Sequence, residues 1–92
     1  MTQIIIFTQP NCPKCPLAKK VVEKVAERVN VEVREIDVST PDGEIEALMY
    51  NVCSTPSIAI GEEVLWRGEV PSEEELEEAV RALLAGSEEV IG

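Results

Sequence analysis

Residues 4–15 read Ile-Ile-Ile-Phe-Thr-Gln-Pro-Asn-Cys-Pro-Lys-Cys. The run Ile4–Phe7 is short and largely β-branched, which is typical of a strand buried on both faces. A turn-prone stretch follows at 8–11. From Pro13 to about Val29 the apolar residues recur at three- and four-residue intervals, which predicts an amphipathic helix. Two cysteines therefore lie where a buried strand passes into a helix.

The rest of the chain predicts five further elements. They are a charged, alternating edge strand at Val31–Val38, a short helix from about Asp42 to Tyr50, a hairpin of Ser57–Ile60 and Val64–Arg67, and a helix that a Ser72-x-x-Glu75 capping box opens and Gly86 ends. This order implies an α/β fold, β-α-β-α-β-β-α, with a mixed four-stranded sheet and helices on both faces. We expect one domain over residues 1–86 and a frayed tail at 87–92.

The charge of the chain limits its partners. The 92 residues include eight Lys and Arg against eighteen Asp and Glu, a net charge of −10. Residues 62–92 hold ten of the acids and two of the cations, so most of the excess lies there. Such a charge disfavours nucleic acid and anionic membrane surfaces. The sequence shows no apolar run of membrane-spanning length and no signal-peptide pattern at its start, so we expect a cytoplasmic protein.

Three cysteines are too few, and odd in number, for the disulfide scaffold of a secreted protein. Cys12 and Cys15 have the Cys-x-x-Cys spacing, which in a reducing compartment indicates redox catalysis or metal binding. Unpaired N–H groups at a helix start stabilise a thiolate, so we expect the pKa of the Cys12 thiol to fall. Pro13 suits the first helical position, Lys14 adds a nearby cation, and Cys15 lies one turn further on.

Two motifs carry a family resemblance. With Cys12-Pro13-Lys14-Cys15 after the first strand and Ser54-Thr55-Pro56 before the third, the chain resembles the thioredoxin superfamily, and its small glutaredoxin-like members most closely. The resemblance covers about residues 3–85 and implies the thioredoxin fold. It also implies that Pro56 is cis and lies beside the cysteine pair, and that the backbone of Thr55 pairs with an extended protein substrate.

The resemblance further implies a catalytic cycle. Cys12 attacks a substrate disulfide, and the more buried Cys15 then attacks the mixed disulfide and releases the reduced protein substrate. Gln9 stands where glutaredoxins carry Lys or Arg, and a single Gly68 stands where they carry Gly-Gly. We therefore expect a flavin-dependent thioredoxin reductase, rather than glutathione, to reduce the cysteine pair. Thioredoxins also bury an acid six residues before the first cysteine, and that position here is Ile6.

Two alternatives stay open for the same cysteines. One is a glutathione-dependent glutaredoxin, and the other is a module that binds a metal or an iron–sulfur cluster. Structural zinc needs four ligands, whereas the chain offers three cysteines and no histidine. A cluster shared across a dimer would meet that requirement. Our preferred interpretation has no metal, no resident cofactor and a monomeric chain.

Several other side chains have both a structural and a functional interpretation. For Cys53 we favour a buried or half-buried spacer, and the alternative is an auxiliary thiol at the rim of the active site. Trp66 is expected to pack on the sheet. Lys19, Lys20 and Lys24 alternate with acids on the polar side of the first helix, so we expect them to face solvent rather than to steer a partner.

Overall fold

Seven elements follow one another in the predicted order. The computed structural model describes residues 3–91. The elements are β1 (Gln3–Thr8), α1 (Cys15–Val29), β2 (Glu32–Asp37), α2 (Pro41–Met49), β3 (Ser57–Ile60), β4 (Glu63–Arg67) and α3 (Glu73–Ile91). Among the described residues, no helix is both long and apolar enough to span a membrane.

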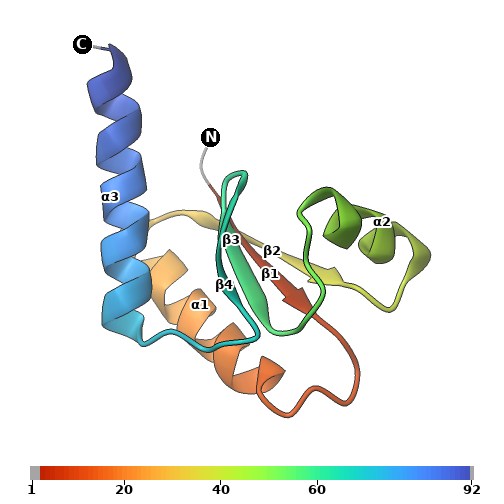
Figure 1. Ribbon diagram of the computed structural model, residues 1–92. Coiled ribbons are helices and arrows are strands. Elements are labelled where there is room, and N and C mark those ends of the chain that lie inside the picture. The colour runs from red at the N-terminus through yellow and green to blue at the C-terminus, as the bar shows by residue number, and fades with distance from the viewer. Residues whose placement is uncertain (1–2, 92) are drawn as a thin grey trace.

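The four strands form one mixed sheet in the order β2-β1-β3-β4 (Figure 1). β1 pairs with β2 in parallel and with β3 antiparallel, and β3 and β4 form the predicted hairpin. β2 is an edge strand, as its charged residues predict. The connection from β1 to β2 passes through α1, which is the crossover that parallel neighbours require.

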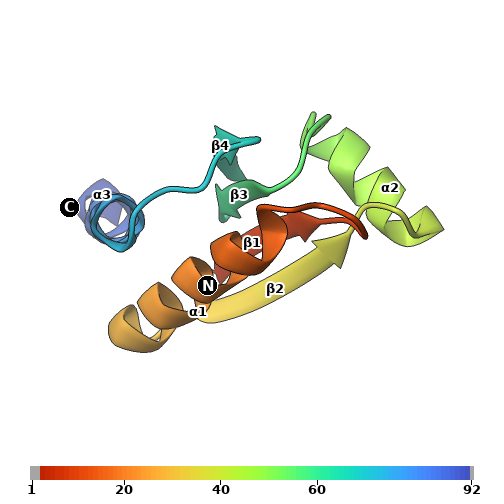
Figure 2. The ribbon, with the colours of Figure 1, turned by 90° about the horizontal axis from the view of Figure 1, so that it is seen from below.

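The helices cover both faces of the sheet, as predicted. α1 and α3 lie on one face and α2 lies on the other (Figures 1 and 2). β1 supplies both cores, because Ile4 and Ile6 pack toward α1 and α3 while Ile5 and Phe7 pack toward α2. Side chains alternate along a strand, so a central strand with two covered faces is apolar throughout.

Charged side chains join α1 to α3 at the edge of the first core. Arg28 on α1 donates to Glu77 at 2.8 Å and to Glu73 at 3.0 Å. Glu77 also accepts from Arg81 at 3.0 Å, and Lys24 lies 3.8 Å from Glu73. Hydrogen bonds from Arg28 and then from Arg81 lower the pKa of Glu77, and the bond to Glu77 raises the pKa of Arg28. These contacts fix α3 on α1 beside its buried residues.

Helix ends agree with the sequence at some positions and differ at others. The predicted capping box is confirmed: the Glu75 amide donates to Ser72 Oγ, and the Ser72 amide donates to the Glu75 carboxylate, each at 3.1 Å. The predicted end of α3 at Gly86 is wrong, because the helix continues to Ile91. Glycine weakens a helix by only about 1 kcal/mol relative to alanine, so it does not compel a stop. Residue 92 lies outside the described residues.

α2 begins close against the end of β2. Thr40 caps it, with its Oγ1 accepting a hydrogen bond of 3.0 Å from the Gly43 amide. Gly43 is buried, and a Cβ on it would overlap the backbone carbonyl of Asp37. The absence of a side chain at Gly43 therefore lets the first turn of α2 lie directly on the chain that leaves β2.

Candidate active site

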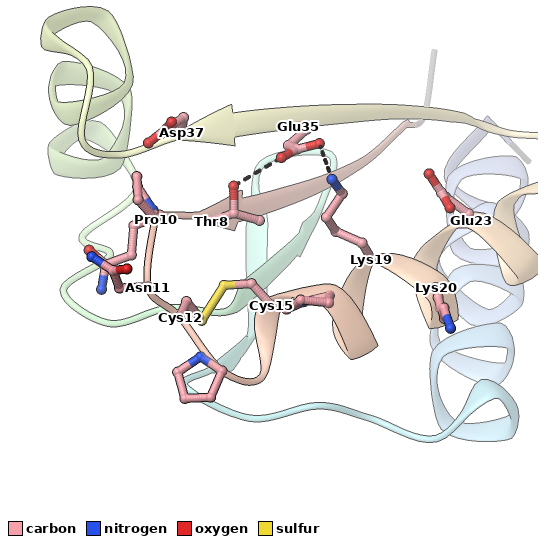
Figure 3. Close-up of a pocket in the computed structure, with 13 residues that line it drawn as sticks. Thr8, Pro10, Asn11, Cys12, Cys15, Lys19, Lys20, Glu23, Glu35 and Asp37 are labelled. Carbon is pink, nitrogen blue, oxygen red and sulfur yellow. Dashed lines mark hydrogen bonds and ion pairs between the residues drawn. A yellow bond between two sulfur atoms is a disulfide. The ribbon is translucent and has the colours of Figure 1, made fainter.

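Cys12 and Cys15 form a disulfide at the start of α1, with their Cα atoms 5.4 Å apart (Figure 3). Asn11, immediately before the pair, adopts a left-handed φ of 65°, a conformation that asparagine tolerates better than most residues. Cys12 is half-buried, whereas Cys15 is only 5% exposed. One sulfur is therefore accessible to a partner and the other lies behind it, as predicted.

The helix begins later than predicted. α1 starts at Cys15 rather than at Pro13, and Pro16 occupies its first turn in the role expected of Pro13. Lys14 is the N-cap residue and is exposed, and the Cys15 amide donates to the Cys12 carbonyl at 3.3 Å. Cys12 thus lies in the turn that leads into the helix, one turn before the first helical residue.

An open cavity of about 710 Å³ lies beside the disulfide. Its walls are the end of β1, the loop at 9–13, the first turns of α1 and the end of β2. Both cysteines and Pro13 line it. The cavity also contains five charged side chains, namely Lys19, Lys20, Glu23, Glu35 and Asp37. The accessible side of the disulfide is therefore bordered by charged groups as well as by prolines.

Two of these charged groups are held together on one wall of the cavity. Lys19 Nζ lies 3.2 Å from Glu35 Oε1, and the hydroxyl of Thr8 donates to Glu35 Oε2 at 3.1 Å (Figure 3). The Lys19 side chain is 42% exposed, as the expectation that it faces solvent implies, but it also pairs with Glu35, which the sequence did not predict. Periodicity along α1 could not reveal this contact, because Glu35 belongs to β2.

Asp37 has a different environment at the end of β2. The Ser39 hydroxyl donates to Asp37 Oδ1 at 2.6 Å, and the Ser39 amide donates to the same oxygen at 2.9 Å. These two hydrogen bonds, the side-chain bond first, lower the pKa of Asp37. Asp37 therefore stabilises the turn into α2 as an ionised carboxylate.

The second motif forms the loop before β3. The Thr55–Pro56 peptide bond is cis, which confirms the expectation from the family resemblance. The Ser57 hydroxyl donates to the Ser54 carbonyl at 2.7 Å, and the Gly68 amide donates to the Pro56 carbonyl at 2.8 Å. Gly68 has a left-handed φ of 75°, and a Cβ on it would lie 3.2 Å from Ser54 Oγ. Gly68 therefore allows the residues after β4 to lie against this loop.

Cys53 is exposed and free, so its predicted place as a buried or half-buried spacer is wrong. Val52, one residue earlier, fills the buried position. Cys53 and Thr55 line a second, smaller cavity of about 190 Å³, which does not include the disulfide. Gln9 lines both cavities and lies between them. The predicted site residues therefore divide into two neighbouring groups.

The prediction for Trp66 can also be compared with the structure. Trp66 packs, half-buried, against the core that α1 and α3 cover, as predicted. Within the part of the chain that the structure describes, no three His, Cys, Asp or Glu side chains are grouped so that they could hold a metal ion.

A thioredoxin fold with a disulfide-forming Cys-x-x-Cys pair defines a class of thiol–disulfide oxidoreductases. The model of the thioredoxin domain family matches residues 2–81, and the chain belongs to this family. It is 40% identical to a probable thioredoxin of Archaeoglobus fulgidus over 96% of each chain. It is 35% identical to a thioredoxin of Methanocaldococcus jannaschii, over 89% of this chain and 95% of that one.

A solved structure shows the same fold. Chloroplastic thioredoxin z superposes with a TM-score of 0.74 and 28% identity, over 92% of this chain and 80% of its own. The protein is accordingly a protein-disulfide oxidoreductase with the thioredoxin fold. The closer likeness to glutaredoxin-like members stays an expectation.

Proposed function

We propose that the chain reduces disulfides in other proteins, with Cys12 as the nucleophile and Cys15 as the resolving thiol. The observation that carries this assignment is the difference in burial within the disulfide: Cys12 is half-buried and Cys15 is 5% exposed. A substrate sulfur can approach the half-buried Cys12 from the cavity. Cys15 is bonded to Cys12 and also lines the cavity, but it is only 5% exposed and is therefore the less accessible of the two.

The cycle conserves atoms and electrons at each step. The Cys12 thiolate attacks one sulfur of the substrate disulfide, a Cys12–substrate bond forms, and the other substrate sulfur leaves as a thiolate. Cys15 then loses its proton and attacks Cys12 Sγ, which forms the Cys12–Cys15 bond and expels the second substrate thiolate. The substrate gains two electrons and two protons, and the dithiol loses them.

Thr55 and Pro56 are proposed to shape the groove that receives the substrate backbone. Thr55 is half-buried and lines the smaller cavity, and Gln9 connects that cavity to the one beside the disulfide. An extended segment lying across Gln9 would reach both Thr55 and Cys12. Strand-like pairing of this kind gives affinity through the main chain and tolerates many substrate sequences.

A flavin-dependent reductase is proposed as the electron donor. Glutathione is an anionic tripeptide, and the cavity beside the disulfide holds three carboxylates against two lysine side chains. Gln9 supplies no positive charge at the entrance. The relatives named thioredoxin support the same choice. We further propose that the protein works as a monomer in the cytoplasm, where the reducing conditions keep the exposed Cys53 thiol free.

Insulin reduction with defined donors tests this proposal. With NADPH and a flavin thioredoxin reductase, the wild type should reduce insulin, whereas glutathione with glutathione reductase should support little turnover. Cys12→Ser should abolish turnover, and Cys15→Ser should accumulate mixed disulfides that mass spectrometry detects on Cys12. Cys53→Ser is the matched control for losing a thiol. Turnover by Cys12→Ser equal to that of the wild type would refute the assignment.

A further inference from the structure

The resolving thiol needs an acceptor for its proton. Cys15 is 5% exposed, so bulk water reaches it poorly. A thiol has an ordinary pKa of about 8.5 and attacks only as the thiolate. On the sheet face that α1 covers, Ile6 and its neighbour Ile58 are apolar and buried, so neither can accept the proton. Cys15 also lines the cavity, and the cavity does contain carboxylates that can accept it.

The register of the sheet brings one carboxylate to the side of the cavity that α1 covers. In the parallel pairing of β1 and β2, Glu35 lies opposite Ile6, whose side chain faces α1. Lys19 follows Cys15 by four residues on α1, so the two side chains lie on the same side of the helix. Figure 3 shows Lys19 and Glu35 directed toward one another on the cavity wall above the disulfide.

The Glu35 carboxylate is fixed at both oxygens. Thr8 is buried, at 6% exposure, and its hydroxyl donates to Oε2, while Lys19 approaches Oε1. The Glu35 and Lys19 side chains are 44% and 42% exposed, and a pair this exposed contributes little to stability. The ammonium and the buried hydroxyl do, however, hold the carboxylate in one place in the cavity that both cysteines line.

The other two carboxylates of the cavity are less well placed to accept the proton. Asp37 lies at the end of β2, where the amide and the hydroxyl of Ser39 both donate to its Oδ1 and hold it in the turn that leads into α2. Glu23 lies two turns beyond Cys15 along α1, whereas Lys19 places Glu35 beside the first turn.

We propose that Glu35 accepts the proton of the Cys15 thiol through solvent in the cavity when Cys15 attacks the mixed disulfide, and that Thr8 and Lys19 position it. The inference rests on the proposed cysteine cycle. The proton passes from Cys15 Sγ to the Glu35 carboxylate, the Cys15–Cys12 bond forms, and the Cys12–substrate bond breaks. The neutral Glu35 then returns its proton to solvent or to the departing thiolate.

Lys19 carries its positive charge beside the Glu35 carboxyl group both before and after the transfer. The proton moves only from Cys15 to Glu35. The net charge of the cavity does not change. The charged and titratable groups facing the reaction are, besides the two cysteines, Lys19, Lys20 and Glu23 from α1 and Glu35 and Asp37 from β2.

Rapid-quench mass spectrometry with hydroxyethyl disulfide, a small neutral substrate, tests the proposal. In a Cys53→Ser background, acid quenching separates the reduced, mixed-disulfide and oxidised proteins, so formation and resolution of the mixed disulfide are timed independently. Glu35→Gln should leave formation unchanged and slow resolution at least about tenfold near neutral pH, a modest share of what a placed proton acceptor contributes. Glu23→Gln, the matched control, should resolve like the background protein.

The pH profile distinguishes proton transfer from a structural effect. The deficit of Glu35→Gln should shrink as the pH rises past about 8.5, where a thiol ionises without help. Thr8→Val should show a smaller deficit with the same pH dependence. Three outcomes would overturn the role of Glu35 and leave the cysteine cycle intact. They are equal resolution rates for Glu35→Gln and the background protein, a deficit independent of pH, and equal slowing of both steps. Failure of the background protein to form a mixed disulfide on Cys12 would overturn the cysteine cycle and this inference together.

Discussion

Replacing Gly43 by alanine tests how closely α2 approaches the end of β2. Helix propensity alone predicts stabilisation, because alanine is favoured over glycine in a helix by about 1 kcal/mol. The structure predicts the opposite sign. A Cβ on Gly43 would overlap the backbone carbonyl of Asp37, and its next contact, Thr40 Oγ1, lies 2.8 Å away. Backbone atoms cannot rotate aside, so the first turn of α2 has to shift.

The magnitude follows from these opposing effects. Overpacking at a well-packed position costs about 3 kcal/mol at the upper end of the usual range. Subtracting the gain in propensity of about 1 kcal/mol leaves a net loss of about 2 kcal/mol. For a domain of this size that corresponds to a fall in the melting temperature of roughly 10 °C.

Thermal and urea unfolding followed by circular dichroism measure the effect of Gly43→Ala. Glu44→Ala, at the next and exposed position of α2, is the control and should stay within about 0.5 kcal/mol of the wild type. A Gly43→Ala protein that melts at or above the wild-type temperature would refute the close approach. Ala47 of α2 and Val52, which precedes the Thr55–Pro56 loop, belong to the core on this face of the sheet. The shift of α2 should therefore also lower the rate of insulin reduction.

Three further outcomes are expected. Glu77→Gln should lower stability near neutral pH. Arg28 and Arg81 depress the folded-state pKa of Glu77, so the ionised Glu77 carboxylate stabilises the fold above the ordinary pKa of 4.5. This stabilisation is lost as the pH falls below that value. Urea midpoints across pH test this, and a gap that persists in acid would contradict it. Leu76→Ala, at a fully buried position, should cost about 2–5 kcal/mol in urea unfolding, and a loss below 1 kcal/mol would show that the core repacks. Cys53→Ser should keep insulin reduction near the wild-type rate, and a tenfold loss would make its thiol part of the cycle.

Local patterns predicted most of the fold because each element carries its own signal. The apolar spacing of α1 and the capping box of α3 depend on residues that are neighbours in the sequence. The start of α1 was misplaced for a local reason as well. Pro13 and Pro16 both suit a first helical turn, and sequence alone does not distinguish them.

The cavity depended on contacts that no single segment contains. Glu35 reaches Lys19 and Thr8 because the parallel register aligns β2 with β1 and because α1 packs on that side of the sheet. The one available signal was alternation along β2, which places Val33 and Glu35 on the same side. The exposure of Cys53 could not be predicted, because no periodicity identifies the inward-facing residue of an irregular loop. Its neighbour Val52 fills the buried position instead.

The charged side chains that join α1 to α3 also affect how the stability of the protein changes with temperature. Hydration of charged groups becomes less favourable on warming, so the desolvation penalty of a network such as Arg28 with Glu73 and Glu77 falls as the temperature rises. An exposed ion pair that contributes little to folding stability at low temperature therefore contributes more as the temperature rises. Added salt should therefore lower the melting temperature more clearly than it lowers stability at room temperature. The share of these ion pairs in holding α3, which carries the buried Leu76 and Val80, would therefore be larger at high temperature than at room temperature.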